Sequence, residues 1–460
     1  MRTLEMPDRR TQRVERILHA PVHGLICRFA APAIVTMLVS ALYNFADTYF
    51  VSGLNDEATA AVGIVYALVC FAQSVGYFWG QGSANHISRE LGSGNAEDAQ
   101  KMAQAGFLCS LFSGLAVTVL GLLLLTPLCL LLGSPDEILS ETRLYCGIIL
   151  LGIPFLMASL TMNCQYRHQG NAVSSMIGIC VGAILNVALD PLLIYRFGWG
   201  LAGAAWATVI SQAASFWILF YQSRTRGNLP LSFTFLRITK RMIRNMLPGG
   251  MPSLWRQSLL SVSMAVLNTV AKPFGVALVA AMSVVSKVMS VCIAIATGFG
   301  QGAQPVWGMN YGAGNYRRVM GAYRFTLLVA FGMDACIGGI CFAAAPQIIQ
   351  LFESAKGSEI CKYGITALRA QCITFPVTSF LLITNMMVQT MGKMFSGTLL
   401  AVARNGLFFL PIVLIFSRQW GVPGIQWAQP CADICAFICT IFVWLEAWHG
   451  LKRPVAAKKT

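Results

Sequence analysis

The chain has 460 residues, of which 56% are hydrophobic and only 11% are charged, and its formal net charge is +15. Soluble domains carry about 25% charged residues, so this composition excludes a water-soluble protein, a disordered chain and a secreted disulfide scaffold. The basic excess does not indicate nucleic-acid binding, because Lys and Arg lie between apolar segments. We therefore predict an all-α polytopic membrane protein.

Twelve segments are apolar enough to cross a bilayer, which requires roughly 20 residues of helix. We expect helices at 26–52, 58–82, 103–132, 142–166, 172–195, 200–222, 249–271, 277–302, 320–344, 362–388, 396–416 and 422–448. A transmembrane barrel is excluded because its strands would alternate in short segments.

The distribution of Lys and Arg predicts the orientation of these helices. With the N-terminus inside, 21 basic residues lie in inner segments and 6 in outer ones. Cytoplasmic segments carry the basic excess, so both termini are predicted to be cytoplasmic, in a bacterial plasma membrane. Residues 1–24 are too polar for a signal peptide.

The chain repeats itself at an offset of 220 to 222 residues. Gly80-Gln81-Gly82 returns as Gly300-Gln301-Gly302, and Trp199-Gly200 returns as Trp420-Gly421. Each half has six helices and starts on the same side, so the repeat is parallel. We predict a cytoplasmic segment (1–24), an N-terminal lobe (25–222), a basic cytoplasmic linker (223–248), a C-terminal lobe (249–449) and a basic tail (450–460). The linker is either solvated or an amphipathic helix on acidic lipid.

Acidic residues inside spans are candidates for function. Asp47 ends a polar stripe on the first helix, and Asp190 lies one helical turn after Asn186. The depth of each residue in its helix places Asp47, Asn186, Asp190 and Thr208 at one level. Carboxylate, amide and hydroxyl oxygens suit a sodium ion or a proton. The alternative is a structural polar cluster, although neither carboxylate recurs in the second half.

The second half is basic instead. Arg256, Lys287, Arg369 and Arg404 lie within spans, where they either pair with Asp334 and Asp433 or contact a substrate. We assign a substrate cavity to polar span residues, namely Asn44, Gln81, Asn163, Arg256, Lys287 and Asn385. Tyr66, Phe71, Tyr77, Phe78 and Trp79 either form aromatic walls of this cavity or, for most of them, pack against lipid. Helix bends are expected at Pro32 and Pro191.

These residues together resemble the multidrug and toxic compound extrusion (MATE) family, and most closely its DinF-like branch. The resemblance depends on Asp47 after Pro32, the Gly-Gln-Gly and Gly-x-Gly-Asn signatures after helices two and eight, and the runs Asn186–Pro191 and Gly200–Thr208. It implies a V-shaped carrier whose N-terminal cation site consists of Asp47, Asn186, Asp190 and Thr208. Some relatives carry acids in helices seven, eight or ten, where this chain has Arg256, Lys287 and Arg369.

We therefore predict an antiporter that exports drug-like amphipathic molecules, above all organic cations, in exchange for protons or sodium. The alternative is a flippase for a lipid-linked saccharide precursor. An enzyme is not expected, because the five histidines show no ligand or triad spacing. We expect a monomer in the lipid bilayer with small-molecule substrates, no cofactor beyond the coupling ion, no metal except sodium at the predicted site, and no nucleic-acid partner.

Overall fold

A computed structural model describes residues 9–234, 238–351 and 359–452, except the side chains of residues 9, 44–49, 52, 56 and 450–452. The first half of the chain forms α1 (Arg9–His19), α2 (Val22–Ser52), α3 (Asp56–Gly92), α4 (Ala96–Leu123), α5 (Leu125–Leu131), α6 (Leu139–His168), α7 (Ala172–Pro191) and α8 (Gly200–Thr225). The second half forms α9 (Lys240–Ala271), α10 (Val276–Gly312), α11 (Tyr316–Ala343), α12 (Ala345–Gln350), α13 (Glu359–Thr390), α14 (Met394–Val402) and α15 (Phe409–Lys452). Short connecting turns are η1 (Asp136–Ile138), η2 (Leu192–Arg196), η3 (Lys272–Phe274) and η4 (Ala403–Phe408).

The helices confirm the predicted two-repeat membrane fold. Among the described residues, ten helical segments are long and apolar enough to span a membrane. The last of these, Met394–His449, reverses at Gly421, where φ is 59° and ψ is −130°. Because this segment therefore crosses twice, and α9 forms a further, less apolar crossing, there are twelve crossings. α3, α4 and α5 recur as α10, α11 and α12 at an offset of 220 residues.

Several predicted helix ends are wrong. The helices expected to end at 82 and 302 continue to Gly92 and Gly312, so both Gly-Gln-Gly signatures lie inside helices and not after them. The chain then turns at Gly94 and Gly314, whose φ angles of 84° and 78° favour glycine. These extra turns were missed because residues 83–92 are polar, and because Pro305, Gly308 and Asn310 interrupt the apolar pattern in 303–312. The helix predicted at 103–132 is also divided, at Leu124.

The linker between the halves packs against the N-terminal lobe. Leu229 and Leu231 are buried, and the backbone N–H of Leu229 donates to Gln169 Oε1 at 2.8 Å. Gln104 accepts from the Ser232 N–H at 3.0 Å and donates back to its carbonyl at 2.5 Å. A solvated linker is therefore wrong for residues 228–232, and residues 240–248 belong to α9.

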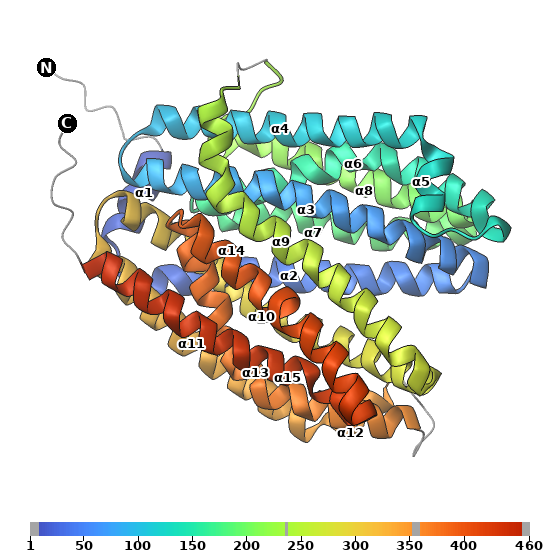
Figure 1. The fold of residues 1–460 in the computed structure, drawn as a ribbon. Coiled ribbons are helices and arrows are strands. Elements are labelled where there is room, and N and C mark those ends of the chain that lie inside the picture. Colours follow the sequence, from blue (N-terminus) through green and yellow to red (C-terminus); the bar gives the residue numbers. More distant parts are fainter. Residues whose placement is uncertain (1–8, 235–237, 352–358, 453–460) are drawn as a thin grey trace, which may run out of the picture.

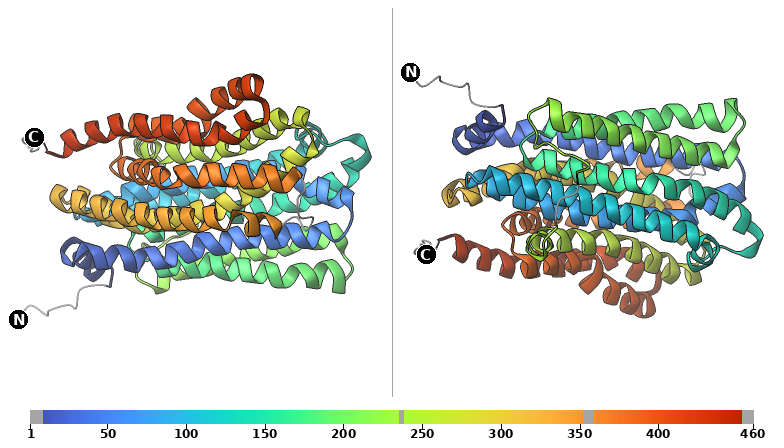
Figure 2. Two further views of the ribbon diagram at one scale, coloured as in Figure 1. Left: turned by 90° about the horizontal axis from the view of Figure 1, so that it is seen from below. Right: turned by 90° about the horizontal axis from the view of Figure 1, so that it is seen from above.

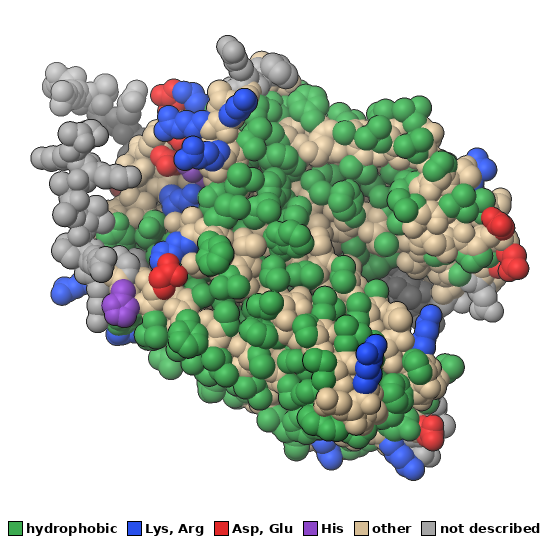
Figure 3. Space-filling model, viewed as in Figure 1, with side chains coloured by type: hydrophobic (Ala, Val, Ile, Leu, Met, Phe, Trp, Pro, Cys, Tyr) green, Lys and Arg blue, Asp and Glu red, His purple; other side chains and the backbone are tan. Residues whose placement is uncertain are grey.

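The two lobes approach each other at the end that carries α1 and diverge toward the opposite end (Figure 1). In both views of Figure 2, α1 and the end of α15 lie at the same end of the molecule. A broad hydrophobic band covers the visible face, and charged side chains gather beyond it at both ends (Figure 3). This distribution suits a protein whose middle faces lipid and whose ends face water.

Glycines bring the lobes into backbone contact at the termini end. A Cβ atom added to Gly92 of α3 would lie 2.0 Å from Met309 O of α10, and one added to Gly312 would lie 1.9 Å from Arg89 O. Further along the interface, a Cβ on Gly82 would lie 2.7 Å from Met246 O, and one on Gly302 would lie 2.5 Å from Ala30. The repeated glycine signatures therefore permit the close approach of the two lobes.

The first prediction concerns this interface. Gly92→Ala and Gly312→Ala should each lower the free energy of unfolding by roughly 1–3 kcal/mol, because the added methyl group meets a carbonyl that belongs to a helix. Thermal unfolding of the purified protein measures the effect. Gly321→Ala is the matched control, since Gly321 lies in α11 and a methyl group added there would have nothing within 4 Å. Equal stability of all three variants would contradict the proposed contact.

Candidate functional site

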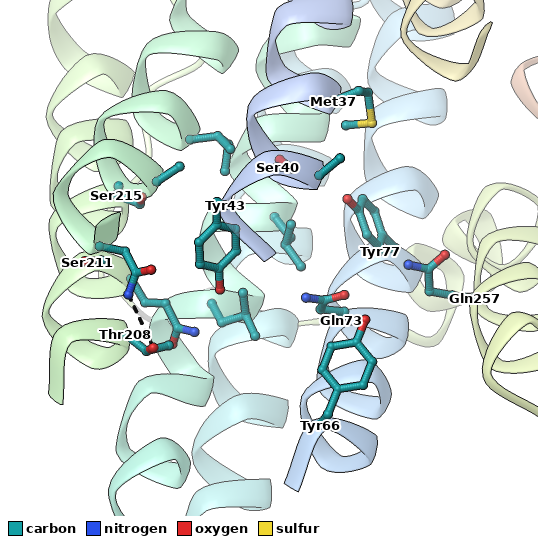
Figure 4. Close-up of a pocket in the computed structure, with 18 residues that line it drawn as sticks. Met37, Ser40, Tyr43, Tyr66, Gln73, Tyr77, Thr208, Ser211, Ser215 and Gln257 are labelled. Atoms are coloured by element: carbon teal, nitrogen blue, oxygen red, sulfur yellow. Dashed lines mark hydrogen bonds between the residues drawn. The ribbon is translucent and has the colours of Figure 1, made fainter. Parts of the chain in front are cut away.

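A cavity of about 280 Å³ lies in the N-terminal lobe, and α9 of the C-terminal lobe contributes to its wall (Figure 4). It is lined by Met37, Ser40, Ala41, Tyr43, Tyr66, Gln73, Tyr77, Leu156, Leu160, Ile179, Gly182, Ala183, Asn186, Thr208, Ser211, Gln212, Ser215 and Gln257. Most of these residues come from α2, α3, α7 and α8. The cavity is therefore a feature of one lobe that the other lobe borders.

The cavity wall is polar and aromatic but uncharged. Among the described residues that line it, none is acidic or basic. Tyr66, Tyr77 and Gln73 lie on one side, hydroxyl groups of α8 lie opposite, and Tyr43 lies between them (Figure 4). Amide and hydroxyl groups can each donate and accept hydrogen bonds, and tyrosine rings attract cations through their faces. Such a wall accepts many orientations of an aromatic molecule.

A buried polar cluster adjoins this cavity. Asn186 Nδ2 donates to Asp190 Oδ1 and to Thr208 Oγ1, each at 3.4 Å. Asp190 is 0% exposed, and Asn186 and Thr208 are buried as well. The Thr208 hydroxyl donates to Ala204 O at 3.1 Å, so its lone pairs face the Asn186 amide. Asn186 and Thr208 also line the cavity, so the cluster and the cavity share side chains.

Small residues on α7 bring the two halves of this cluster together. A Cβ atom on Gly182 would lie 1.8 Å from Ser215 Oγ, and one on Gly178 would lie 2.3 Å from Leu219 Cγ, both on α8. α7 and α8 therefore pack closely enough for Thr208 to reach Asn186. The spacing of four residues between Asn186 and Asp190 puts both side chains on the same face of α7.

The cluster has the chemistry of a cation site. A charged carboxylate removed from water is costly unless hydrogen bonds, a proton or a cation compensate it. Asn186 Oδ1 is buried and accepts no hydrogen bond from the described residues. If the amide turned over, this oxygen would join those of Asp190 and Thr208 as a third hard ligand, of the kind that sodium prefers.

Two predicted members of the site are not described at the level of side chains. Asp47 and Asn44 lie within α2, and their side chains are outside the described residues. Ser40 and Tyr43, just before them on α2, line the same cavity as Asn186 and Thr208. The meeting of Asp47 with Asp190 remains a prediction.

The structure places five other predicted cavity residues elsewhere. Gln81 Nε2 contacts Cys164 Sγ at 3.7 Å, and Asn163 Nδ2 donates to Ser175 Oγ at 2.6 Å. Arg256 donates to Asn385 Oδ1 at 3.4 Å. Lys287 is exposed on α10. None of these residues is among those that line the cavity, because helix rotation directs their side chains to other neighbours.

The bends at Pro32 and Pro191 stay predictions. α2 is assigned as one helix from Val22 to Ser52 through Pro32. Pro191 is the last residue of α7 and is followed by the π-helical turn η2. The Tyr195 hydroxyl of η2 donates to Phe50 O at 2.7 Å, which ties this turn to α2.

The polar cavity residues that the sequence analysis missed include three glutamines. Gln73, Gln212 and Gln257 line the cavity, although none was assigned to it. The sequence signal that could have identified them was a neutral amide side chain inside an apolar span. Of the five aromatic residues considered as walls, Tyr66 and Tyr77 line the cavity, whereas Phe71, Phe78 and Trp79 do not.

Two buried acids of the C-terminal lobe, Asp334 and Asp433, have side-chain partners, although Asp334 Oδ1 accepts no hydrogen bond from the described residues. Arg404 Nε pairs with Asp433 Oδ1 at 2.8 Å, and Gln429 donates to the same oxygen at 2.9 Å. Asp334 is buried and accepts a hydrogen bond from Ser379 Oγ. Ion pairing thus accounts for Arg404. Arg369 instead donates to Phe342 O at 3.3 Å.

Two repeated six-helix lobes, joined at one end and bordering a cavity within the membrane span, define a secondary carrier. The chain belongs to the MatE family, whose model matches residues 32–192 and 252–415, one match in each lobe. It is a multidrug and toxic compound extrusion (MATE) transporter and not an enzyme.

Known proteins resemble the chain over almost its full length. The multidrug export protein MepA of Staphylococcus saprophyticus is 25% identical over 427 residues, which cover 91% of this chain and 92% of that protein. The outward-facing structure of a multidrug resistance MATE family transporter of the MOP superfamily is 25% identical, with a TM-score of 0.89 over 95% of this chain and 98% of the other. A MOP superfamily transporter from Pyrococcus furiosus, described as having a binding pocket of reverse polarity, is 26% identical, with a TM-score of 0.87 over 95% and 98%.

The second prediction tests the buried cluster. Thr208→Val keeps the shape of the side chain but removes the oxygen that accepts from Asn186. A buried donor that loses its acceptor costs about 1–3 kcal/mol, so the free energy of unfolding should fall by that amount. Chemical unfolding in detergent measures it. Thr208→Ser, which retains the oxygen, is the control, and native stability of Thr208→Val would exclude this hydrogen bond.

Proposed function

We propose that the chain exports drug-like amphipathic molecules, above all organic cations, in exchange for protons or sodium ions. One observation carries the proposal: Asn186 and Thr208 bond within the buried Asp190 cluster and also line the cavity. A change in the charge state of Asp190 therefore acts on two side chains that a substrate would touch. That shared pair provides a direct physical link between ion binding and drug binding.

If ion binding is to drive drug release, the Asp190 carboxylate must change partners during transport. When the cavity is open to water outside, Asp190, together with the predicted partner Asp47, would take up a proton or a sodium ion. Neutralisation would remove the penalty for closing this lobe around the site, and α2 and α7 would then pack more closely. The cavity would shrink and release the drug. Loss of the ion to the cytoplasm would restore the cavity.

The cavity wall supports organic cations as substrates. Tyr43, Tyr66 and Tyr77 offer aromatic faces to a cationic or aromatic group. Because no described lining residue is basic, a cation meets no repulsion from the wall itself. The name of the relative MepA, a multidrug export protein, agrees with this chemistry.

The flippase alternative depends on basic side chains, and none is among the described residues that line the cavity. Arg167 is buried and donates to Asn163 Oδ1 at 3.1 Å, and Arg256 donates to Asn385. Neither arginine lines the cavity. A phosphate-bearing saccharide precursor would thus meet no cationic side chain among the described residues of the wall itself, which favours an exporter.

The chain is a multi-pass membrane transporter with bacterial relatives, which supports a place in a bacterial plasma membrane. We extend this to an orientation with both termini in the cytoplasm, on the grounds of the positive-inside bias. The closed end of the V would then face the cytoplasm, and its open end would face outward. We further propose that the chain works as a monomer, because each chain contains both lobes.

The third prediction tests coupling. Asp190→Asn and Asp47→Asn imitate the neutral carboxyl group and remove its ability to exchange an ion, so each should abolish gradient-driven export. Efflux of a fluorescent organic cation from proteoliposomes, under an imposed proton or sodium gradient, measures this. Asp334→Asn is the matched control, since Asp334 is equally buried but lies in the other lobe and bonds to Ser379. Normal export by Asp190→Asn would remove Asp190 from the mechanism.

The fourth prediction tests the aromatic wall. Tyr66→Leu should raise the KM for a planar organic cation several-fold, because a cation–aromatic contact contributes about 0.5–2 kcal/mol. Tyr66→Phe should retain most of the affinity. Tyr221→Leu is the control, because Tyr221 is 69% exposed on α8 and is not among the lining residues. If Tyr66→Leu and Tyr221→Leu raised the KM equally, the effect of Tyr66 would come from the surface that faces the membrane and not from the cavity wall.

A further inference from the structure

A second cavity, of about 440 Å³, lies at the termini end of the N-terminal lobe. It is lined by Gln12, Arg13, Arg16, Ile17, Leu25, Arg28, Phe29, Gly170, Asn171, Ala172 and Val173. These residues come from α1, from the start of α2, and from the turn that leads into α7. It shares no residue with the proposed drug cavity, and no role in drug export is assigned to it.

The charged side chains in this cavity are all arginines. Arg13, Arg16 and Arg28 line it, and none of its described lining residues is acidic. Arg13 NH2 donates to Arg226 O at 3.1 Å, and NH1 lies 3.5 Å from Asn228 Oδ1. Arg16 and Arg28 are exposed. The first residues of α7 add the positive end of a helix dipole, so the cavity favours an anion.

The cavity is held in place by contacts that fix α1. Ile17 of α1 is 0% exposed, and a Cβ atom on Gly170 would lie 2.5 Å from its Cδ1. At the end of α1, Arg318 NH2 donates to Ile17 O at 3.2 Å and to Ala20 O at 2.7 Å. The arginines on α1 are therefore presented from a docked helix and not from a loose tail.

Apolar side chains continue from the cavity along the outer surface. On α2, Arg28 is followed on the same face by Val35 and Leu42, which are 43% and 61% exposed. On the neighbouring α7, Val173 lines the cavity and is followed by Ile184, which is 66% exposed. Residues of α2 and α7 that line the drug cavity, such as Ser40 and Gly182, lie on the opposite faces of these helices. The outer stripes thus face lipid.

We propose that this cavity binds an acidic phospholipid of the adjacent leaflet. Arg16 and Arg28, with Arg13, would bind the phosphate and the anionic headgroup, as basic pockets between transmembrane helices do. One acyl chain would lie along Val173 and Ile184, beside Val35 and Leu42. The exposed apolar side chains on the same helix faces favour a lipid over a free phosphate, which would use the arginines alone.

Native mass spectrometry of the full chain, with added dioleoyl phosphatidylglycerol or dioleoyl phosphatidylcholine, tests the proposal. Phosphatidylglycerol should form the tighter single adduct, and Arg16→Gln/Arg28→Gln should weaken it roughly 10- to 30-fold. Arg241→Gln/Arg244→Gln removes the same charge from exposed residues of α9 outside this cavity and should leave the adduct unchanged. Equal binding of both lipids, or an equal loss in both double variants, would overturn the proposal.

A second arm distinguishes a lipid from a simple anion. Inorganic phosphate at millimolar concentration should not displace dioleoyl phosphatidylglycerol, and the dihexanoyl form should bind more weakly. Val173→Asn should weaken the dioleoyl adduct more than the dihexanoyl one, because it interrupts the acyl track. Displacement by phosphate, or indifference to chain length, would show that the cavity is an anion site only. Both arms measure binding and not transport, so the outcome is independent of the proposed export function.

Discussion

The contact on which the whole arrangement depends is the meeting of α3 and α10, backbone against backbone, at the end where the chain begins and ends. Gly92 and Gly312 allow it from the two sides, because each presents no side chain to a carbonyl of the other helix. Arg89 adds a hydrogen bond to Thr390 O at 2.7 Å, from the first lobe to the second. With the lobes fixed here, their opposite ends are free to diverge (Figure 1). The cavity lies in the N-terminal lobe, where α9 of the other lobe borders it.

The fold is symmetric, but its chemistry is not. The buried Asn186–Asp190–Thr208 cluster and nearly all of the cavity wall belong to the first half, and the second half contributes Gln257. In the second half, Asp433 is bonded by Arg404 and Gln429, and Asp334 is bonded by Ser379 through one of its two oxygens. After duplication of one six-helix unit, one copy could thus serve as the working site and the other as the partner against which it moves.

Sequence periodicity was enough to predict the twelve crossings, the parallel repeat and the approach of Asn186, Asp190 and Thr208, because these follow from helix length and from fixed rise and turn. It did not predict how each helix is rotated. Gln81 and Asn163 look like cavity residues in the sequence, but packing directs them toward Cys164 and Ser175. The docking of Leu229 against the first lobe was also hidden, because it depends on Gln169, which is distant in sequence.

Two arginine side chains at the end where the lobes meet affect the free energy needed to separate the lobes there. Arg89 binds the last carbonyl of α13, and Arg318 binds two carbonyls at the end of α1. Hydrogen bonds to charged groups contribute about 1.5–3 kcal/mol each, so separating the lobes at this end would cost several kcal/mol if Arg89 and Arg318 lost their partners. Without ligands, nearly all molecules would then be in the conformation in which the lobes are joined at this end. A ligand would have to bind the other conformation more tightly, by a comparable free energy, before that conformation became populated. A compound that binds weakly could therefore occupy the protein without being transported.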